Sequence, residues 1–260
     1  MDYQQELTVA ITAARLGGSV LREGIGTIAD VRSVGYKGQV DLVTDFDHHS
    51  ERLILSFITD HFPDHSILAE ESSGTKRPSE FRWIIDPLDG TTNFVHGYPV
   101  CCVSIALEHK GQVVIGAVYD PFREELFSAV TNQGATLNGQ AIRVSQTPDL
   151  AHSLLATGFP YDRSQLDEVL LRFGRLTRLS QAVRRDGAAA LNLCYVACGR
   201  FDGFWEATLQ PWDVAAGALI ITEAGGIITD FTGVPWRTDH HSAIAANSLG
   251  LFDEISRALR

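Results

Sequence analysis

The chain has 260 residues and a formal net charge of −11, and 45% of its residues are hydrophobic. These values predict one large or two small domains with a substantial buried core. The acidic balance argues against nucleic acid as the main ligand, because a phosphate backbone requires clustered Lys and Arg. The sequence has no run of about eighteen apolar residues, so no membrane span is expected.

The N-terminal stretch and the cysteines indicate a cellular compartment. MDYQQELTVA lacks the basic and apolar regions of a signal peptide. The cysteines, which are Cys101, Cys102, Cys194 and Cys198, show no CxxC spacing. They indicate reduced thiols, and we therefore expect a cytoplasmic protein.

The first part of the chain predicts two helices. Residues 3–23 place apolar side chains at helical spacing, beginning with Leu7 and Ile11. Residues 44–62 predict a second helix, with Thr44 as its N-cap and Pro63 just beyond its end.

Strands follow these helices. Short apolar runs that end in acids lie at 66–70 and 83–86. Longer strand-like runs follow at 100–107, 112–120 and 124–130. Asn138–Gln140, with the sequence NGQ, predicts a hairpin turn.

The second half of the chain alternates strands and helices. It predicts strands at 153–158, 201–206, 227–230 and 243–247. It predicts helices at 164–178, 187–199, 212–226 and the C-terminus. Strands first and alternation later indicate layered sheets and helices in an α/β (α+β) fold. We expect one domain, 1–260, with subregions of about 1–147 and 148–260.

The stretch WIIDPLDGTTNF, residues 83–94, contains the strongest candidate site. Asp86 follows an apolar run directly, and Asp89 comes three residues later. Two ionised carboxylates so close together repel each other and are costly to desolvate unless a cation lies between them. Hard cations such as Mg²⁺ prefer these oxygen ligands, and backbone carbonyls can join them.

A short helix is predicted to begin directly after these acids, at Thr91. The free N–H groups at its start, with Gly90 allowing close approach, would form an anion site. Metal ligands followed by a phosphate cradle suit phosphoryl chemistry. The alternative is a plain turn, since Asp-Pro and Asp-Gly are common turn dipeptides. The Asp-Pro dipeptide occurs again at Asp120-Pro121, where no run of acid, glycine and threonine follows it.

Three other acids have structural explanations when each is considered alone. Thr44-x-x-Asp47 resembles a capping box. Asp213 suits the first turn of a helix, where the helix dipole favours an acid. Glu70 follows a short apolar run and would also suit a solvated loop.

The same stretches resemble a known family. WIIDPLDGTTNFVHGYP followed by VSIAL closely resembles the first signature of the inositol monophosphatase family. WDVAAGALIITEAGG resembles its second signature, and VDLVTDFD and EES match two further blocks in the expected order. The resemblance covers nearly the whole chain. It implies a layered α/β/α/β/α sandwich of the sugar-phosphatase type and a homodimer.

The resemblance implies a set of metal ligands for two to three Mg²⁺ ions per subunit. One ion is expected at Glu70, Asp86 and the Leu88 carbonyl. A second is expected at Asp86, Asp89 and Asp213, and a third, weaker one at Glu70. Mg²⁺ would then bridge an acidic protein and an anionic substrate.

The resemblance also implies catalytic roles. Thr91 and Asp47 are expected to orient and deprotonate the attacking water, and Glu70 is expected to act with them. The Gly90 and Thr91 N–H groups are expected to hold phosphate.

Substrate contacts are implied at Asp89, Ala189 and Glu206, where Glu206 meets a substrate hydroxyl. Ala188 stands where some members have Thr. Lys37 lies four residues before Asp41, a spacing found in bacterial members.

The implied function is a Mg²⁺-dependent, lithium-sensitive phosphomonoesterase acting on myo-inositol monophosphates, a class of small phosphorylated polyols. Related enzymes hydrolyse histidinol phosphate, fructose 1,6-bisphosphate or 3′-phosphoadenosine 5′-phosphate. A partner-binding protein that retains the fold is a further alternative. Arg184-Arg185 would either steer phosphate or pair with acids at an interface, and the sequence leaves both open.

Overall fold

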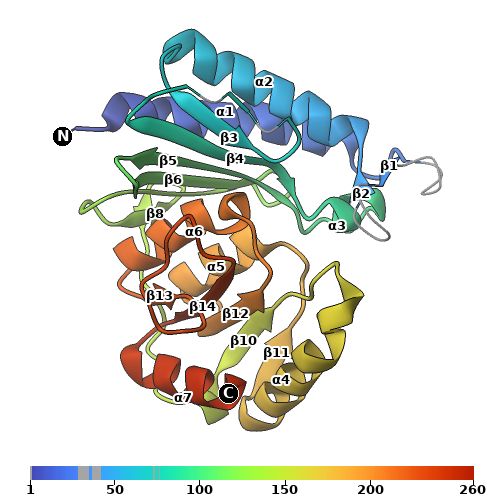
Figure 1. Ribbon diagram of the computed structural model, residues 1–260, viewed down its shortest axis with the longest axis vertical. Helices are drawn as coiled ribbons and strands as arrows, with labels where there is room; N and C mark the ends of the chain where they lie inside the picture. The colour runs from blue at the N-terminus through green and yellow to red at the C-terminus, as the bar shows by residue number, and fades with distance from the viewer. Residues whose placement is uncertain (1, 29–34, 37–41, 73, 76) are drawn as a thin grey trace.

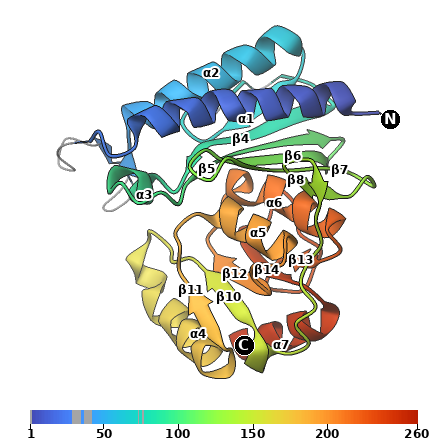
Figure 2. The ribbon, with the colours of Figure 1, turned by 180° about the vertical axis from the view of Figure 1, so that it is seen from behind.

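The chain forms a stack of helix and sheet layers in a computed structural model, which describes residues 2–28, 35–36, 42–72, 74–75 and 77–260. Figure 1 shows a helix pair, a sheet, a second helix pair, a second sheet and a third helix pair from top to bottom. Figure 2 shows the same order from behind. The expected α/β/α/β/α sandwich is confirmed.

The first layer contains α1 (Gln4–Gly24) and α2 (Asp45–His61), as predicted. Both helices pack on one face of the first sheet, and their apolar faces close a core around Trp83 and Ile105. Thr44 caps α2, and Asp47 completes the predicted capping box. The cap therefore fixes Asp47 at the helix start.

The first sheet has seven strands in sequence order, and only the β3–β4 pair is parallel. Positive φ angles at Asn138 and Gly139 form the predicted hairpin turn before the last strand. The strands are β3 (Ser66–Ala69), β4 (Phe81–Asp89), β5 (Cys102–His109), β6 (Gln112–Asp120), β7 (Glu125–Val130), β8 (Ala135–Leu137) and β9 (Gln140–Ala141).

Strand β4 corrects one expectation, because it does not end at Asp86. It pairs with β5 through Asp86↔Ser104 and again through Asp89↔Cys102. β4 advances three residues between these pairs while β5 advances two, so β4 contains a one-residue bulge. Pro87 lies in this bulge, where its missing N–H breaks no ladder hydrogen bond. The bulge turns both carboxylates toward the cavity described below.

Helices α5 (Ala189–Ala197) and α6 (Pro211–Glu223) form the middle layer between the sheets. Almost every side chain of α5 is buried, as is Val214–Ile221 of α6. A helix that is apolar on all sides is typical of a central layer covered from above and below.

The second sheet has the strand order β11-β10-β12-β14-β13. Strand β10 pairs in parallel with β11 and β12, and the remaining pairs are antiparallel. The strands are β10 (Leu154–Thr157), β11 (Ala182–Arg184), β12 (Gly203–Ala207), β13 (Ile227–Thr229) and β14 (Ser242–Ala246). Strand β11 was not predicted, because three residues at a sheet edge carry no readable alternation.

Helices α4 (Leu166–Leu179) and α7 (Leu249–Leu259), which were both predicted to be helical, cover the outer face of this sheet. The short helix predicted after Gly90 is α3 (Thr91–Val95). Four small elements were not predicted, namely β1 (Gly35–Tyr36), β2 (Leu42–Val43) and the 3₁₀ turns η2 (Leu150–His152) and η3 (Arg163–Gln165). None of the helices in the described ranges has the length and apolar character needed to cross a membrane.

Candidate active site

A cavity with two lobes lies where the first sheet meets the second half of the chain. We call the part lined by Glu70, Asp86, Leu88, Gly90 and Thr91 the acidic lobe. We call the part lined by Gly158, Arg185, Ala189, Asn192 and Glu206 the mixed lobe. Both lobes are also lined by Asp89, Tyr161, Thr208 and Asp213.

Neighbouring strands bring Glu70 and Asp86 together. Glu70 follows β3, which is parallel to β4, and its N–H donates to the Ile85 carbonyl at 3.2 Å. Asp86 is only 2% exposed, and its Oδ1 accepts the Leu88 N–H at 2.9 Å. The parallel pair thus places both acids at the same end of the sheet.

The acids of the acidic lobe perturb one another. Burial, and then the negative charges of Glu70, Asp89 and Asp213, raise the pKa of Asp86 well above its usual range. Burial likewise raises the pKa of Asp213, although the Gln210 N–H opposes this shift. Carboxyl groups held this close are stabilised in their charged form only by a cation or by donors aimed at them.

Asp47 and Thr91 form a hydrogen-bonded pair across 44 residues of chain. The Thr91 hydroxyl donates to Asp47 Oδ1 at 3.0 Å, and the Leu88 carbonyl lies 3.1 Å from the same hydroxyl oxygen. The other Asp47 oxygen accepts the Thr44 N–H at 2.7 Å and the Thr44 hydroxyl at 2.6 Å. The capping explanation and the proposed catalytic pair therefore use different oxygens of one carboxylate.

Asp213 reaches the cavity from the start of α6. Pro211 occupies the first turn, and Asp213 Oδ2 accepts the Gln210 N–H at 2.7 Å. The helix start therefore fixes the direction of this carboxylate, as its sequence position suggested.

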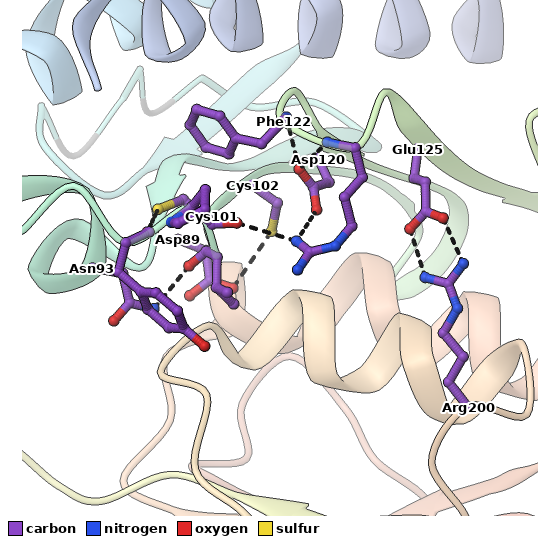
Figure 3. A network of polar contacts seen from close by, with 12 residues as sticks. Asp89, Asn93, Cys101, Cys102, Asp120, Phe122, Glu125 and Arg200 are labelled. Carbon is purple, nitrogen blue, oxygen red and sulfur yellow. Dashed lines mark hydrogen bonds and ion pairs between the residues drawn. The ribbon is translucent and has the colours of Figure 1, made fainter. Parts of the chain in front are cut away.

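Asp89 connects the two halves of the chain. Its oxygens accept the Ala189 N–H at 3.2 Å and the Ala190 N–H at 2.8 Å, both at the start of α5. The Cys102 thiol also points at Asp89, with Sγ 3.5 Å from Oδ2 (Figure 3). Burial raises the pKa of Asp89 to about 7, although these donors oppose the shift.

Gly90 connects β4 to α3 with a φ of +95°, in the left-handed region. A Cβ at this position would lie 2.8 Å from the Val100 carbonyl oxygen. Only glycine fits this turn without strain, and it lets α3 begin directly beside the acids.

Glu206 lies on β12 and faces the mixed lobe. Burial, with a smaller contribution from the charge of Asp89, raises its pKa to about 8, while Arg185 opposes the shift. Gly158 packs directly over its carboxylate, so a Cβ at 158 would overlap both oxygens. Ala189 lines the same lobe, so the structure brings together the two substrate positions implied by the family resemblance.

Sequence reasoning missed several cavity residues. Asn93 Nδ2 donates to the Val100 carbonyl at 2.8 Å and to the Asp186 carbonyl at 2.7 Å, which ties α3 to the loop before α5. Figure 3 places Asn93 beside Asp89 in this network. Its only sequence signal is its place in the TTNF motif. Tyr161 lies in a loop with no periodic pattern that would have revealed it.

The two adjacent arginines whose role the sequence left open, Arg184 and Arg185, occupy different environments in the structure. Arg185 lines the mixed lobe, with its guanidinium carbon 5.5 Å from the centre of the Phe159 ring. Arg184 ends β11 on the exposed surface. Lys37 lies outside the described residues.

The acidic lobe has the donor chemistry of a hard cation site. Its polar lining includes four carboxylates, the hydroxyls of Thr91, Tyr161 and Thr208, and backbone groups, and oxygen ligands of this kind are those that Mg²⁺ prefers. In the part of the chain that the structure describes, no three His, Cys, Asp or Glu side chains form a closed metal cage. Burial and then the charges of the neighbouring acids raise the pKa of Asp86, and a divalent ion would relieve the repulsion among these acids.

Comparisons with known proteins identify a family for this chain. A family model described as the Inositol monophosphatase family matches residues 2–260. The inositol-1-monophosphatase of Synechocystis sp. is 46% identical over 260 residues, which is 99% of this chain and 90% of that protein. The Nus factor SuhB of Escherichia coli is 45% identical over 231 residues, which is 87% of this chain and 85% of that protein.

A solved structure of an inositol monophosphatase from Anabaena (Nostoc) sp. superposes on this chain with a TM-score of 0.89 at 44% identity. The match covers 100% of this chain and 96% of that one. The similarity therefore extends over both sheets and all the cavity segments.

Proposed function

The chain belongs to the inositol monophosphatase family, and from this premise we propose that it is a Mg²⁺-dependent phosphomonoesterase that hydrolyses myo-inositol monophosphates to inositol and phosphate. The observation that carries the proposal is the meeting of four acids with the Asp47–Thr91 pair around one cavity. A fold-only relative would have no reason to keep all of them in this arrangement.

The residues proposed to hold Mg²⁺ are Glu70, Asp86, Asp89 and Asp213, with the Leu88 carbonyl. When bound, Mg²⁺ supplies positive charge that neutralises phosphoryl oxygens, favours deprotonation of water and stabilises the leaving alkoxide. The proposal includes two to three ions per subunit, with Glu70 serving the third and weakest.

Thr91 and Asp47 are proposed to position the attacking water. Because the Thr91 hydroxyl donates its proton to Asp47 Oδ1, its oxygen lone pairs are available to accept a proton from water. As the water oxygen bonds to phosphorus, the bond between phosphorus and the inositol oxygen breaks, and the inositol alkoxide leaves and takes a proton from solvent. The proton of the attacking water moves to Thr91, and the Thr91 proton moves to Asp47. Asp47 thus acts as the base through the threonine.

The phosphate and the polyol are proposed to occupy different lobes. The N–H groups of Gly90 and Thr91 hold the phosphate beside the acids. Glu206 accepts hydrogen bonds from ring hydroxyls, and Ala189 leaves room for the ring. Asp89 lies at the junction and contacts substrate from its position between the lobes.

Several finer features belong to the same proposal. The enzyme acts on a small phosphorylated polyol in the cytoplasm, as a homodimer, and Li⁺ inhibits it. A Li⁺ titration at limiting Mg²⁺ tests the inhibition, and sedimentation equilibrium tests the dimer. Unchanged turnover across the titration would contradict the first feature, and a monomeric mass would contradict the second.

A second candidate is a partner-binding protein that retains the fold. Relatives of this chain at 44–46% identity are named Nus factor SuhB, a name that specifies no phosphatase. The hydrogen-bonded Asp47–Thr91 pair favours the enzyme, since binding a partner does not require it.

A substrate panel with purified protein tests the proposal. Inositol 1-phosphate, histidinol phosphate, fructose 1,6-bisphosphate and 3′-phosphoadenosine 5′-phosphate are each assayed with Mg²⁺ and with EDTA. We expect Mg²⁺-dependent phosphate release, fastest from inositol 1-phosphate. A folded protein that releases phosphate from none of them would favour the partner-binding alternative.

A further inference from the structure

Asn192 is a buried amide without a hydrogen-bonding partner. It lies on α5 in the run AALNLCYVA, where it is the one side chain with an amide among apolar neighbours. Asn192 is 1% exposed, and its Oδ1 contacts no donor. Among the described residues, its side chain makes no hydrogen bond.

An unsatisfied buried amide lowers stability, because the group loses its hydrogen bonds to water and gains none in exchange. Such groups are rare in folded proteins, and each calls for an explanation. Leucine is nearly isosteric and would suit the apolar helix better. The stability cost therefore indicates that this amide serves a purpose other than folding.

Asn247 provides the contrast. Its Oδ1 is also buried without a partner, but its Nδ2 donates to Ser145 Oγ and to the Thr147 carbonyl, each at 2.9 Å. Asn247 therefore holds, by hydrogen bonds, the segment that connects the two sheets. The Asn192 side chain, in contrast, links no segments of the described chain by hydrogen bonds.

The position of Asn192 supplies the explanation. It lines the mixed lobe together with Glu206, Leu209 and Asp213, and its burial places it at the floor of that lobe. The lobe has a volume of about 110 Å³, which exceeds the space of a single water-sized group. Ala188, Ala189 and Leu209 line the same lobe and carry no polar side-chain atom, so Asn192 supplies an amide among apolar wall residues.

We propose that Asn192 is a specificity-determining residue that hydrogen-bonds a hydroxyl group of the substrate at the floor of the mixed lobe. An amide offers both an acceptor and donors, and a hydroxyl both donates and accepts, so the two groups are complementary. Glu206, a carboxylate that accepts hydrogen bonds, lines the same lobe. Asn192 and Glu206 would each hydrogen-bond a different hydroxyl of one polyol. This inference rests on the proposed phosphatase function and specifies how its polyol is recognised.

Asn192→Leu tests the inference. We expect KM for inositol 1-phosphate to rise about tenfold, the value of one buried hydrogen bond, with kcat little changed. Hydrolysis of p-nitrophenyl phosphate, which has no hydroxyls, should be unchanged. The melting temperature should equal or exceed that of the wild type, because no hydrogen bond within the described chain is lost.

Asn247→Leu is the matched control. It removes two hydrogen bonds at a residue that lines neither lobe, so it should lower the melting temperature and leave the ratio between the two substrates unchanged. If Asn192→Leu behaves in this same way, or loses activity equally on both substrates, Asn192 is structural and the inference is wrong.

Monodeoxy analogues of inositol 1-phosphate identify the hydroxyl. For one analogue, wild type and Asn192→Leu should have equal kcat/KM, because the contact is already absent. If the ratio of wild-type to variant kcat/KM is the same for every analogue as for inositol 1-phosphate, no single hydroxyl contacts Asn192. That result would indicate that Asn192 binds a buried water and would overturn the inference.

The outcome for the proposed function is read from the wild type alone. If the wild type rejects inositol 1-phosphate but hydrolyses another polyol phosphate, the proposed substrate is wrong and the variant ratio is measured on that ester. A wild type that prefers no hydroxylated ester over p-nitrophenyl phosphate would overturn the inference about Asn192.

Discussion

The two lobes of the cavity differ in how the chain builds them. The acidic lobe takes its largest group of residues from one continuous stretch, Asp86–Thr91, at and just beyond the end of β4. Its carboxylates accept hydrogen bonds from Leu88, Gln210 and the start of α5, and the neighbouring Asp47 accepts one from Thr44. The mixed lobe is assembled from separate segments, namely 89–93, 158–161, 185–192, 206–209 and Asp213.

The polar groups of the mixed lobe are also held differently. In the described chain, Glu206 and Asn192 accept no hydrogen bond, and Arg185 has only its contact with the Phe159 ring. The chain therefore preorganises the groups proposed for chemistry, whereas Glu206 and Asn192, which are proposed to bind substrate hydroxyls, accept no hydrogen bond from the described chain. Preorganised charge suits a step shared by all phosphate esters, whereas unsatisfied polar groups suit selection among them.

The largest effect is expected from Asp213→Asn, which breaks the acidic lobe. Loss of an outer-shell partner of a metal costs about ten- to a hundredfold, so loss of a proposed direct ligand should reduce kcat/KM by more than about a hundredfold. The loss should be the same for inositol 1-phosphate and p-nitrophenyl phosphate. The Gln210 cap is kept by asparagine, so circular dichroism should show a folded protein. Near-wild-type turnover would remove Asp213 from the metal site.

Glu206→Gln should distinguish the proposed role of the mixed lobe from that of the acidic lobe. Removing one charged hydrogen bond to a ring hydroxyl should cost roughly 1.5–3 kcal/mol, or about ten- to a hundredfold in kcat/KM for inositol 1-phosphate. The simple ester should be little affected. Equal losses on both substrates would assign Glu206 to the acidic lobe or to the fold, and no loss on either would make it a passive wall residue.

Gly158→Ala should reproduce part of that effect without touching Glu206 itself. The added methyl overlaps the flexible end of the Glu206 side chain, so the carboxylate moves and the backbone does not. We expect a loss of about tenfold for inositol 1-phosphate, below that of Glu206→Gln. The melting temperature should stay close to that of the wild type. In the Glu206→Gln background the same change should add little, and full additivity would contradict the coupling.

The smallest effect concerns stability and pH in protein treated with EDTA. Folding raises the pKa of Asp89 to about 7 and that of Glu206 to about 8, above their ordinary values. The folded state therefore binds more protons than the unfolded state between about pH 4 and 8. The stability contribution of these protons is complete below the ordinary pKa values and is lost as pH rises through 7 and 8.

Thermal melts from pH 5 to 8.5 check this dependence. The melting temperature should fall with rising pH in EDTA, and saturating Mg²⁺ should remove the part due to the acidic lobe, because a cation stabilises its ionised acids. Glu206→Gln should remove the part due to the mixed lobe. A melting temperature that rises with pH in EDTA would contradict the sign of both shifts.

Much of the acidic lobe follows from the sequence, because its chemistry is local. The apolar run ending in Asp86, the spacing to Asp89 and the glycine before a helix start can be read along one stretch of chain. Helix caps explain why Asp47 and Asp213 could be placed as well, since Thr44 and Gln210 lie three residues before them. Long periodic elements such as α1 and α2 were predicted for the same reason.

What only the tertiary structure decided are the features that join distant segments. The bulge in β4 depends on its register with β5, and β11 exists only because β10 lies beside it. Asn192 looks like an irregularity in an apolar helix until the middle layer buries it under the mixed lobe. Hydrogen-bond satisfaction is a property of what surrounds a side chain, and along the sequence those surroundings lie dozens of residues away.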